Sequence, residues 1–372
     1  MGVVPRTHWI FGRWRLKISK RVVGLELGDF FIKSAQVRLS GGRKPYLEKF
    51  SEFGCPEGVD RDGRVLDVES VAKSLKQLWL TAEYRTKRVA LGVGNGQIYV
   101  RTLSIPKMPK SKLESALPEL ALGLLPRPAE ELILDFYPIR EVDMGGKLHI
   151  EGLLVAAEKQ SVENLVAAVE LAGLKVNSVD LVPFAVLRHF VSKEDPDTTF
   201  ALVHVAGGVV TVVAARGKVP LFIRLIPLTP KERSQPPLDL ERDKTGENTS
   251  NLPTVLAKEL IENTKSTNST VRPNRFLDSA PGRQKLAREI SDTIRYFNQT
   301  DLNQPISQIL LTGFTLNHGP FPGDLAEASG IKLRPVLQSP FGHKKRRTNK
   351  VENVETADEL IAAIALASWE IK

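Results

Sequence analysis

The chain has 372 residues, of which 42% are hydrophobic and 26% are charged, as in ordinary globular proteins. Chains of this length usually divide into two lobes, because a single core rarely organises so many residues. The one cysteine, Cys55, excludes an intrachain disulfide and a cysteine metal site. No apolar run approaches the roughly 18–20 residues that span a bilayer, and the N-terminus lacks the apolar core of a signal peptide. We therefore expect a cytoplasmic protein that reaches any membrane through its surface or a partner.

Positive charge is unevenly distributed along the chain, which has a formal net charge of +9. Six lysines and arginines and no acids lie in residues 1–23, where Trp9, Phe11 and Trp14 are interleaved with them. Basic and aromatic residues together suit the headgroup region of an anionic membrane, so residues 1–20 are predicted to touch a membrane surface. The alternative is a disordered tail. The rest of the chain contains no nucleic-acid-binding motif, which disfavours nucleic acid as a partner.

One order of strands and helices occurs twice along the chain. In the first copy, three strands precede a helix and a short buried strand, at residues 22–27, 32–39, 46–53, 67–82 and 89–93. The second copy repeats this order at residues 201–205, 209–214, 221–226, 286–297 and 306–311. Each copy then adds a helix, a strand and a helix. Such a duplicated βββαβαβα unit resembles the plan of the actin, Hsp70 and sugar-kinase superfamily, whose lobes face each other across a nucleotide cleft. The alternative is two unrelated α/β lobes.

The two copies set the predicted domain limits and differ in their insertions. We expect a basic aromatic tail, a first lobe and a second lobe, at residues 1–20, 21–198 and 199–372. The first lobe carries an insertion at about 97–158 that predicts a strand, a helix and two strands, the last three at residues 111–124, 132–139 and 148–156. Ser111 and Glu114 have the spacing of a capping box, and Pro118 is expected to kink the helix. The second lobe carries a polar insertion at about 229–279, which predicts a flexible loop.

Several short stretches resemble, in the same order, the PilM family of type IV pilus assembly proteins. They are residues 23–28 with the following Lys33, and residues 86–91, 125–128, 134–136, 172–175 and 182–184. The inserted subdomain also occupies the place where PilM and the cell-division protein FtsA carry an extra subdomain. The resemblance runs from about Val22 to the C-terminus, without 229–279. It implies an actin-like ATPase fold over two lobes, with an FtsA/PilM-type subdomain inserted in the first.

The PilM resemblance also implies a partner and a place in the cell. PilM proteins lie on the cytoplasmic face of the inner-membrane platform and bind the N-terminal tail of the membrane protein PilN, in a groove beside the extra subdomain. We therefore expect a PilN-like partner, with contacts from Arg101, Leu117, Leu120, Leu124 and Phe136. The alternative is that the apolar residues pack the subdomain's own core and that Arg101 is a solvated strand residue.

Actin-like proteins hold ATP between two hairpins and a third glycine-rich turn, near acidic residues that hold Mg²⁺. The residues at those positions here are Glu26, Gly28, Asp29, Lys33, His204, Gly207, Gly208, Gly313 and Thr315. Asp29 would repel phosphate, His204 replaces an acid of the family, and Phe314 replaces a glycine in the third turn. We therefore predict a degenerate site with no catalytic residue, no metal ligand and at most weak binding of ATP with Mg²⁺.

Other interpretations of the same residues stay open. Glycine suits any tight hairpin, Lys33 can be a solvated strand residue, and His204 can be satisfied within its strand. Two other functions are a working actin-like ATPase and an FtsA-like filament protein anchored by a C-terminal amphipathic helix. The last helix, expected from Ala357 onward, is rich in alanine and lacks a basic face, which indicates a core helix instead.

Overall fold

A computed structural model describes residues 21–28, 31–38, 45–60, 63–94, 98–190, 197–206, 208–228, 279–300, 304–313, 319–335 and 360–371 of the chain. The predicted membrane-contacting tail, and the polar insertion up to residue 278, lie outside the described residues. None of the helices in the described ranges is long and apolar enough to cross a bilayer.

The first lobe is built on a five-stranded sheet in the order β3-β2-β1-β4-β8. Its strands are β1 (Arg21–Leu27), β2 (Phe31–Arg38), β3 (Tyr46–Gly54), β4 (Arg88–Val93) and β8 (Lys175–Leu181). Helices α1 (Val68–Thr81) and α3 (Lys159–Leu171) cover one face, where α1 packs on Leu25 and Leu91. Strands β1, β4 and β8 run parallel, so their carboxyl ends lie at the same edge of the sheet.

The second lobe repeats this plan in a five-stranded sheet of order β11-β10-β9-β12-β13. Its strands are β9 (Thr199–Ala206), β10 (Val209–Arg216), β11 (Val219–Pro227), β12 (Gln308–Gly313) and β13 (Lys332–Pro335). Helices α6 (Ala280–Thr300) and α7 (Phe321–Ser329) cover one face. In each sheet, two neighbouring strand pairs are antiparallel and two are parallel. This shared arrangement confirms the predicted duplication of one α/β plan.

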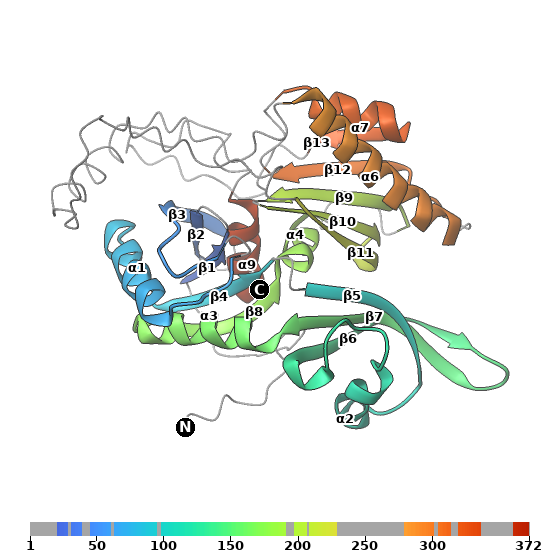
Figure 1. The fold of residues 1–372 in the computed structure, drawn as a ribbon, viewed down its shortest axis with the longest axis horizontal. Coiled ribbons are helices and arrows are strands. Elements are labelled where there is room, and N and C mark those ends of the chain that lie inside the picture. Colours follow the sequence, from blue (N-terminus) through green and yellow to red (C-terminus); the bar gives the residue numbers. More distant parts are fainter. Residues whose placement is uncertain are drawn as a thin grey trace, which may run out of the picture.

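Two helices from different parts of the chain, α4 (Val182–Phe190) and α9 (Ile361–Ile371), lie between the two sheets (Figure 1). Helix α9 packs on β1, β2 and β4, and α4 packs against α9 and β10. A β-carbon on Gly24 of β1 would lie 1.8 Å from the carbonyl oxygen of Ala363, so α9 rests directly on the backbone of the first sheet. Residues 360–368 are all buried, as expected of the predicted core helix.

The inserted subdomain is a three-stranded antiparallel sheet in the order β5-β7-β6, with helix α2 beside it. Its elements are β5 (Ile98–Pro106), α2 (Lys110–Leu120), the 3₁₀ helix η1 (Ala129–Glu131), β6 (Leu132–Asp143) and β7 (Leu148–Glu158). The predicted elements are therefore present in the predicted order. In Figure 1 this subdomain lies below the second lobe, with the β6–β7 hairpin extending outward.

Two details of α2 differ from the prediction. The helix ends at Leu120 rather than four residues later, shortly after Pro118, which removes a backbone donor from its last turn. The capping-box prediction is wrong, because the helix already begins at Lys110 with Pro109 at the N-cap. Ser111 therefore lies inside the first turn, and no side chain caps the helix.

Candidate functional sites

One row of residues crosses all five strands of the first sheet near the carboxyl ends of its parallel strands. In register from β3 to β8, the row is Glu52, Lys33, Glu26, Gly92 and Asp180. Directly paired residues point to the same face of a sheet, and this is the face that α9 covers. Glu26 and Asp180 are only 8% and 7% exposed, so the row carries two buried carboxylates.

Apolar side chains separate these two carboxylates at Gly92. A β-carbon there would lie 2.5 Å from Cδ1 of Leu366 and 3.0 Å from Cγ2 of Val182, so α9 and α4 fill the space above this glycine. Asp180 forms an ion pair with Arg188 of α4, which ties the end of β8 to that helix. Asp180 was not among the predicted site residues; it lies inside β8, next to the last residue of that strand.

The second sheet carries a neutral polar row at the corresponding place. Thr211 of β10, His204 of β9 and Thr312 of β12 are in register and buried. Leu202, two residues before His204, packs in the same core cluster as α4, so this row faces α4. Both ring nitrogens of His204 and the hydroxyl of Thr312 lack a hydrogen-bond partner within the described ranges.

The imidazole of His204 is affected mainly by its own burial. Burial, and to a smaller extent the ammonium of Lys33, lowers the pKa of His204 from 6.5 to about 3. The imidazole is therefore neutral at physiological pH. Glu26 lies beside Lys33 on the neighbouring strand.

The predicted phosphate and adenosine turns lie at the ends of these rows. The N–H of Gly28 donates to the carbonyl of Phe31 at 3.0 Å and closes the β1–β2 turn. Gly313 ends β12 with a φ of +97°, and a β-carbon there would lie 2.1 Å from the carbonyl oxygen of Val205, so the position requires glycine. Gly208 directly precedes β10. The remaining predicted residues, Asp29, Gly207 and Thr315, lie outside the described part of the chain.

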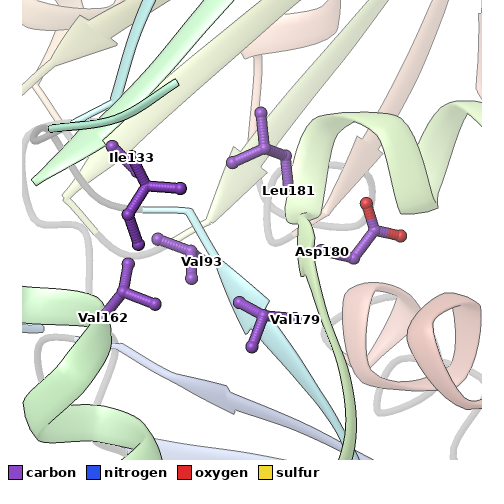
Figure 2. Close-up of a pocket in the computed structure, with 7 residues that line it drawn as sticks. Val93, Ile133, Val162, Val179, Asp180 and Leu181 are labelled. Carbon is purple, nitrogen blue, oxygen red and sulfur yellow. The ribbon is translucent and has the colours of Figure 1, made fainter. Parts of the chain in front are cut away.

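An apolar pocket lies where the first lobe meets the inserted subdomain (Figure 2). Its lining comes from β4, β6, β7, α3 and β8, namely Val93, Ile133, Ala157, Val162, Val179, Asp180 and Leu181. The side chains of Val93, Val162 and Val179 turn toward one another, whereas the carboxylate of Asp180 points away toward α4. The interior of the pocket is therefore aliphatic, and the charge of Asp180 belongs to its ion pair with Arg188.

A family model described as type IV pilus assembly protein PilM matches residues 24–226, more than half of the chain. The chain belongs to this PilM family. Cell division protein FtsA of Bacillus subtilis (strain 168) is 23% identical over 194 aligned positions, and the match covers 46% of this chain and 44% of FtsA. The match thus spans less than half the length of that relative.

A solved structure gives the wider comparison for the PilM fold. It is described as a PilM-PilN type IV pilus biogenesis complex, and it superposes with a TM-score of 0.74 at 24% identity. The match covers 95% of this chain and 99% of the other. Together with the duplicated sheets and the inserted subdomain, it confirms the predicted actin-like fold.

The residues predicted to contact a partner of this PilM protein all belong to the inserted subdomain. Leu117 and Phe136 are buried in its core, which was the alternative considered for them. Leu120 is half-buried, and Leu124 is 37% exposed just beyond the end of α2. Arg101 is exposed on β5, where its guanidinium donates to the carbonyl of the preceding residue at 2.9 Å. None of these five residues lines the pocket.

Proposed function

We propose that this PilM protein is a scaffold of the type IV pilus assembly platform, at the cytoplasmic face of the inner membrane. Its proposed partner is the N-terminal tail of a PilN-like membrane protein. Family membership supports the role in pilus assembly. The description of the similar solved structure as a PilM-PilN complex supports a partner of this kind. The observation that carries the proposal is the PilM family match over residues 24–226.

An aliphatic side chain from an extended peptide is proposed to anchor at this pocket, which as it stands has room for about one water molecule and must open to admit the side chain. Branched apolar side chains on four elements form its walls, and burying an apolar group contributes roughly 25 cal/mol per Å². Among the described strands, β6 pairs with β7 alone, so a peptide beside β6 can add backbone hydrogen bonds to those of the anchor. Tyr137 of β6 stacks on Phe184 of α4 with ring centroids 5.9 Å apart, which holds this edge strand against the first lobe.

The predicted contact residues with accessible side chains lie on the α2 side of the inserted sheet, because Arg101 pairs with Leu154 and not with the pocket residue Ala157. Arg101, Leu120 and Leu124 are exposed or half-buried, and we propose that they contact the tail beyond its anchor. Leu117 and Phe136 contribute indirectly by supporting the subdomain, because their side chains are buried within it. A few anchors are expected to dominate the affinity, as in most peptide grooves.

Ala157→Leu tests the pocket directly, because it adds a bulky side chain at a lining position. Ala116→Leu makes the same change on α2 of the same subdomain, away from the lining, and serves as the matched control. Calorimetric titration with a peptide of the partner's N-terminal tail should show at least about tenfold weaker binding to Ala157→Leu and unchanged binding to Ala116→Leu. Equal affinity of the two folded variants would contradict the proposed groove.

The site between the lobes is proposed to be degenerate for ATP with Mg²⁺. Mg²⁺ prefers carboxylate oxygens and water, whereas the second row offers the imidazole of His204 between two threonine hydroxyls. In the first row, Asp180 is engaged by Arg188. These residues do not fit a metal-bound triphosphate.

Calorimetry with Mg²⁺ and ATP tests this degeneracy. No binding tighter than about 0.1 mM, near −5.5 kcal/mol, is expected. A micromolar affinity that Lys33→Ala abolishes would instead support the working ATPase considered above.

A further inference from the structure

The last turns of α1 and α3 expose two large apolar side chains at one edge of the first sheet. Leu80 of α1 is 73% exposed, and Leu171 of α3 is 49% exposed. Helix α1 leads into β4 and α3 leads into β8, and these two strands are parallel neighbours, so both helices end at the amino edge of the sheet. The helices also pack against each other (Figure 1). The two leucines are therefore exposed at the same end of the first lobe.

Exposed basic side chains occupy the same edge. Arg85 and Lys87 lie between α1 and β4, and Lys175 begins β8. Lys76 lies one turn before Leu80 on α1. All four basic side chains are exposed. The N–H of Lys175 donates to the carbonyl of Lys87 at 2.7 Å, which places these two lysines side by side at the starts of adjacent strands. Together with the two leucines, the four basic residues form the amino-edge patch.

The acids beside the amino-edge patch offset only part of its charge. Glu83 pairs with Nζ of Lys49 at 2.9 Å, so that pair is neutral. Glu170, in the last turn of α3, is exposed. Residues 1–20 precede β1, which starts at this same edge, and their sequence contains five lysines and arginines and no acid. Positive charge therefore exceeds negative charge at this end of the lobe.

We propose that the amino-edge patch binds the surface of an anionic lipid bilayer. This inference rests on the proposed location at the inner membrane and adds the face of the protein that meets it. Lysine and arginine are attracted to anionic headgroups, and exposed leucines are stabilised by entering the apolar boundary beneath the headgroups. A nucleic acid would attract the same charges but would offer the leucines no apolar layer.

The amino-edge patch and the aliphatic pocket lie at opposite edges of the first sheet. Lys87 and Lys175 stand at the starts of β4 and β8, whereas the pocket residues Val93 and Leu181 end the same two strands. In Figure 1, α1 lies at the left of the molecule, and the second lobe and the inserted subdomain lie at the right. Contact between the patch and a bilayer thus leaves the pocket accessible to the partner's tail.

Co-sedimentation of the full-length protein with lipid vesicles tests the proposal. Vesicles of phosphatidylcholine with about one third phosphatidylglycerol should bind the protein at least about tenfold more tightly than vesicles of phosphatidylcholine alone. Added salt should weaken this binding, because it screens the charges. Equal binding to both kinds of vesicle, or binding to neither, would overturn the proposal.

Charge reversal tests whether the attraction comes from the patch or from residues 1–20. Lys87→Glu combined with Lys175→Glu should lower the partition coefficient on the anionic vesicles at least about tenfold. Lys110→Glu combined with Lys112→Glu makes the same change in net charge on α2 of the inserted subdomain, and it should alter binding by less than about twofold. All four lysines are exposed, so both variants are expected to fold. Equal partitioning of the two variants would place the binding elsewhere in the chain and overturn the proposal.

The exposed leucines distinguish a bilayer from other anionic partners. Leu80→Gln should lower partitioning on the anionic vesicles at least about threefold, because it removes apolar surface that the bilayer would bury. Leu122→Gln is the matched control, since Leu122 is also 73% exposed but lies just beyond the end of α2. Equal partitioning of these two variants would indicate attraction by charge alone, as for a nucleic acid, and would overturn the bilayer proposal.

Calorimetry with the partner's tail peptide separates this inference from the proposed function. The charge-reversed patch variant should bind the peptide with the same dissociation constant as the unaltered protein, because the pocket lies at the opposite edge. Vesicle binding that depends on the patch, in a protein that does not bind the peptide, would contradict the proposed partner while supporting the bilayer surface.

Discussion

The two lobes place different chemistry on equivalent positions of one framework. The equivalent pairs, first lobe before second, are Glu26 and His204, Lys33 and Thr211, and Gly92 and Thr312. The first row is charged, whereas the second is neutral and contains a buried imidazole. The strand order has thus been retained in both lobes while the side chains at the junction have diverged, so the fold alone does not determine the ligand.

The central helices meet the two sheets in different ways as well. Gly24 of β1 lets the backbone of α9 approach the first sheet, because a β-carbon there would lie 1.8 Å from a carbonyl oxygen. The equivalent residue of the second sheet is Leu202, which is fully buried in the cluster that includes α4. The first lobe therefore uses a backbone contact where the second uses side-chain packing.

Gly24→Leu, which gives the first lobe the residue of the second, is expected to have the largest effect. The added side chain would collide with the backbone of α9, which no rotamer change relieves. The free energy of unfolding should fall by about 4 kcal/mol or more in urea denaturation. Gly323→Ala on α7 is the control, because nothing lies within 4 Å of its β-carbon position. A Gly24→Leu protein as stable as the control would refute the close contact.

Breaking the buried ion pair at the end of β8 should have the next largest effect. Asp180→Ala leaves the guanidinium of Arg188 without its carboxylate and should cost about 3 kcal/mol of unfolding free energy. Glu151→Ala removes a partner of Arg140 in an exposed pair of the inserted sheet and should cost less than about 1 kcal/mol. Chemical denaturation measures both losses. Equal losses of unfolding free energy for Asp180→Ala and Glu151→Ala would contradict a buried ion pair between Asp180 and Arg188.

The buried imidazole of His204 should make stability depend on pH. Its pKa in the folded protein is about 3, below the ordinary value of 6.5, so protons bind the unfolded chain first as the pH falls. The contribution of neutral His204 to stability is present in full above pH 6.5 and is lost progressively toward pH 3.

Urea denaturation of His204→Gln near pH 7 and near pH 5 measures this contribution. Between these conditions the variant should lose about 2 kcal/mol less unfolding free energy than the unaltered protein. His149→Gln on β7 removes a histidine outside the row and should retain the original pH dependence. The same pH dependence in both variants would contradict a buried neutral His204.

Much of this fold follows from local patterns in the sequence. Alternating apolar residues at 32–39 and the apolar run at 209–214 predict strands that the structure contains, and the three- and four-residue spacing after Asp67 predicts α1. The spacing of Ser111 and Glu114 is misleading, since the N-cap is Pro109, two residues before the Ser111 that a capping box would use.

The candidate sites are harder to predict from local sequence patterns, because they depend on the register between strands that are distant in the sequence. Glu26 of β1 and Asp180 of β8 share a row only because both strands pair with β4. The pocket brings together Val93, Ile133 and Val162, each of which is an ordinary apolar residue in its own segment. Their convergence is a property of tertiary structure that no local periodicity encodes.

The most direct measurement is the affinity of the partner's N-terminal tail peptide for the full-length protein, by calorimetry, once in EDTA and once with Mg²⁺ and ATP. If the aliphatic pocket recruits the partner without nucleotide, the two dissociation constants should agree within about twofold. Binding that is detectable only with Mg²⁺ and ATP would contradict a scaffold whose site between the lobes has lost its nucleotide function.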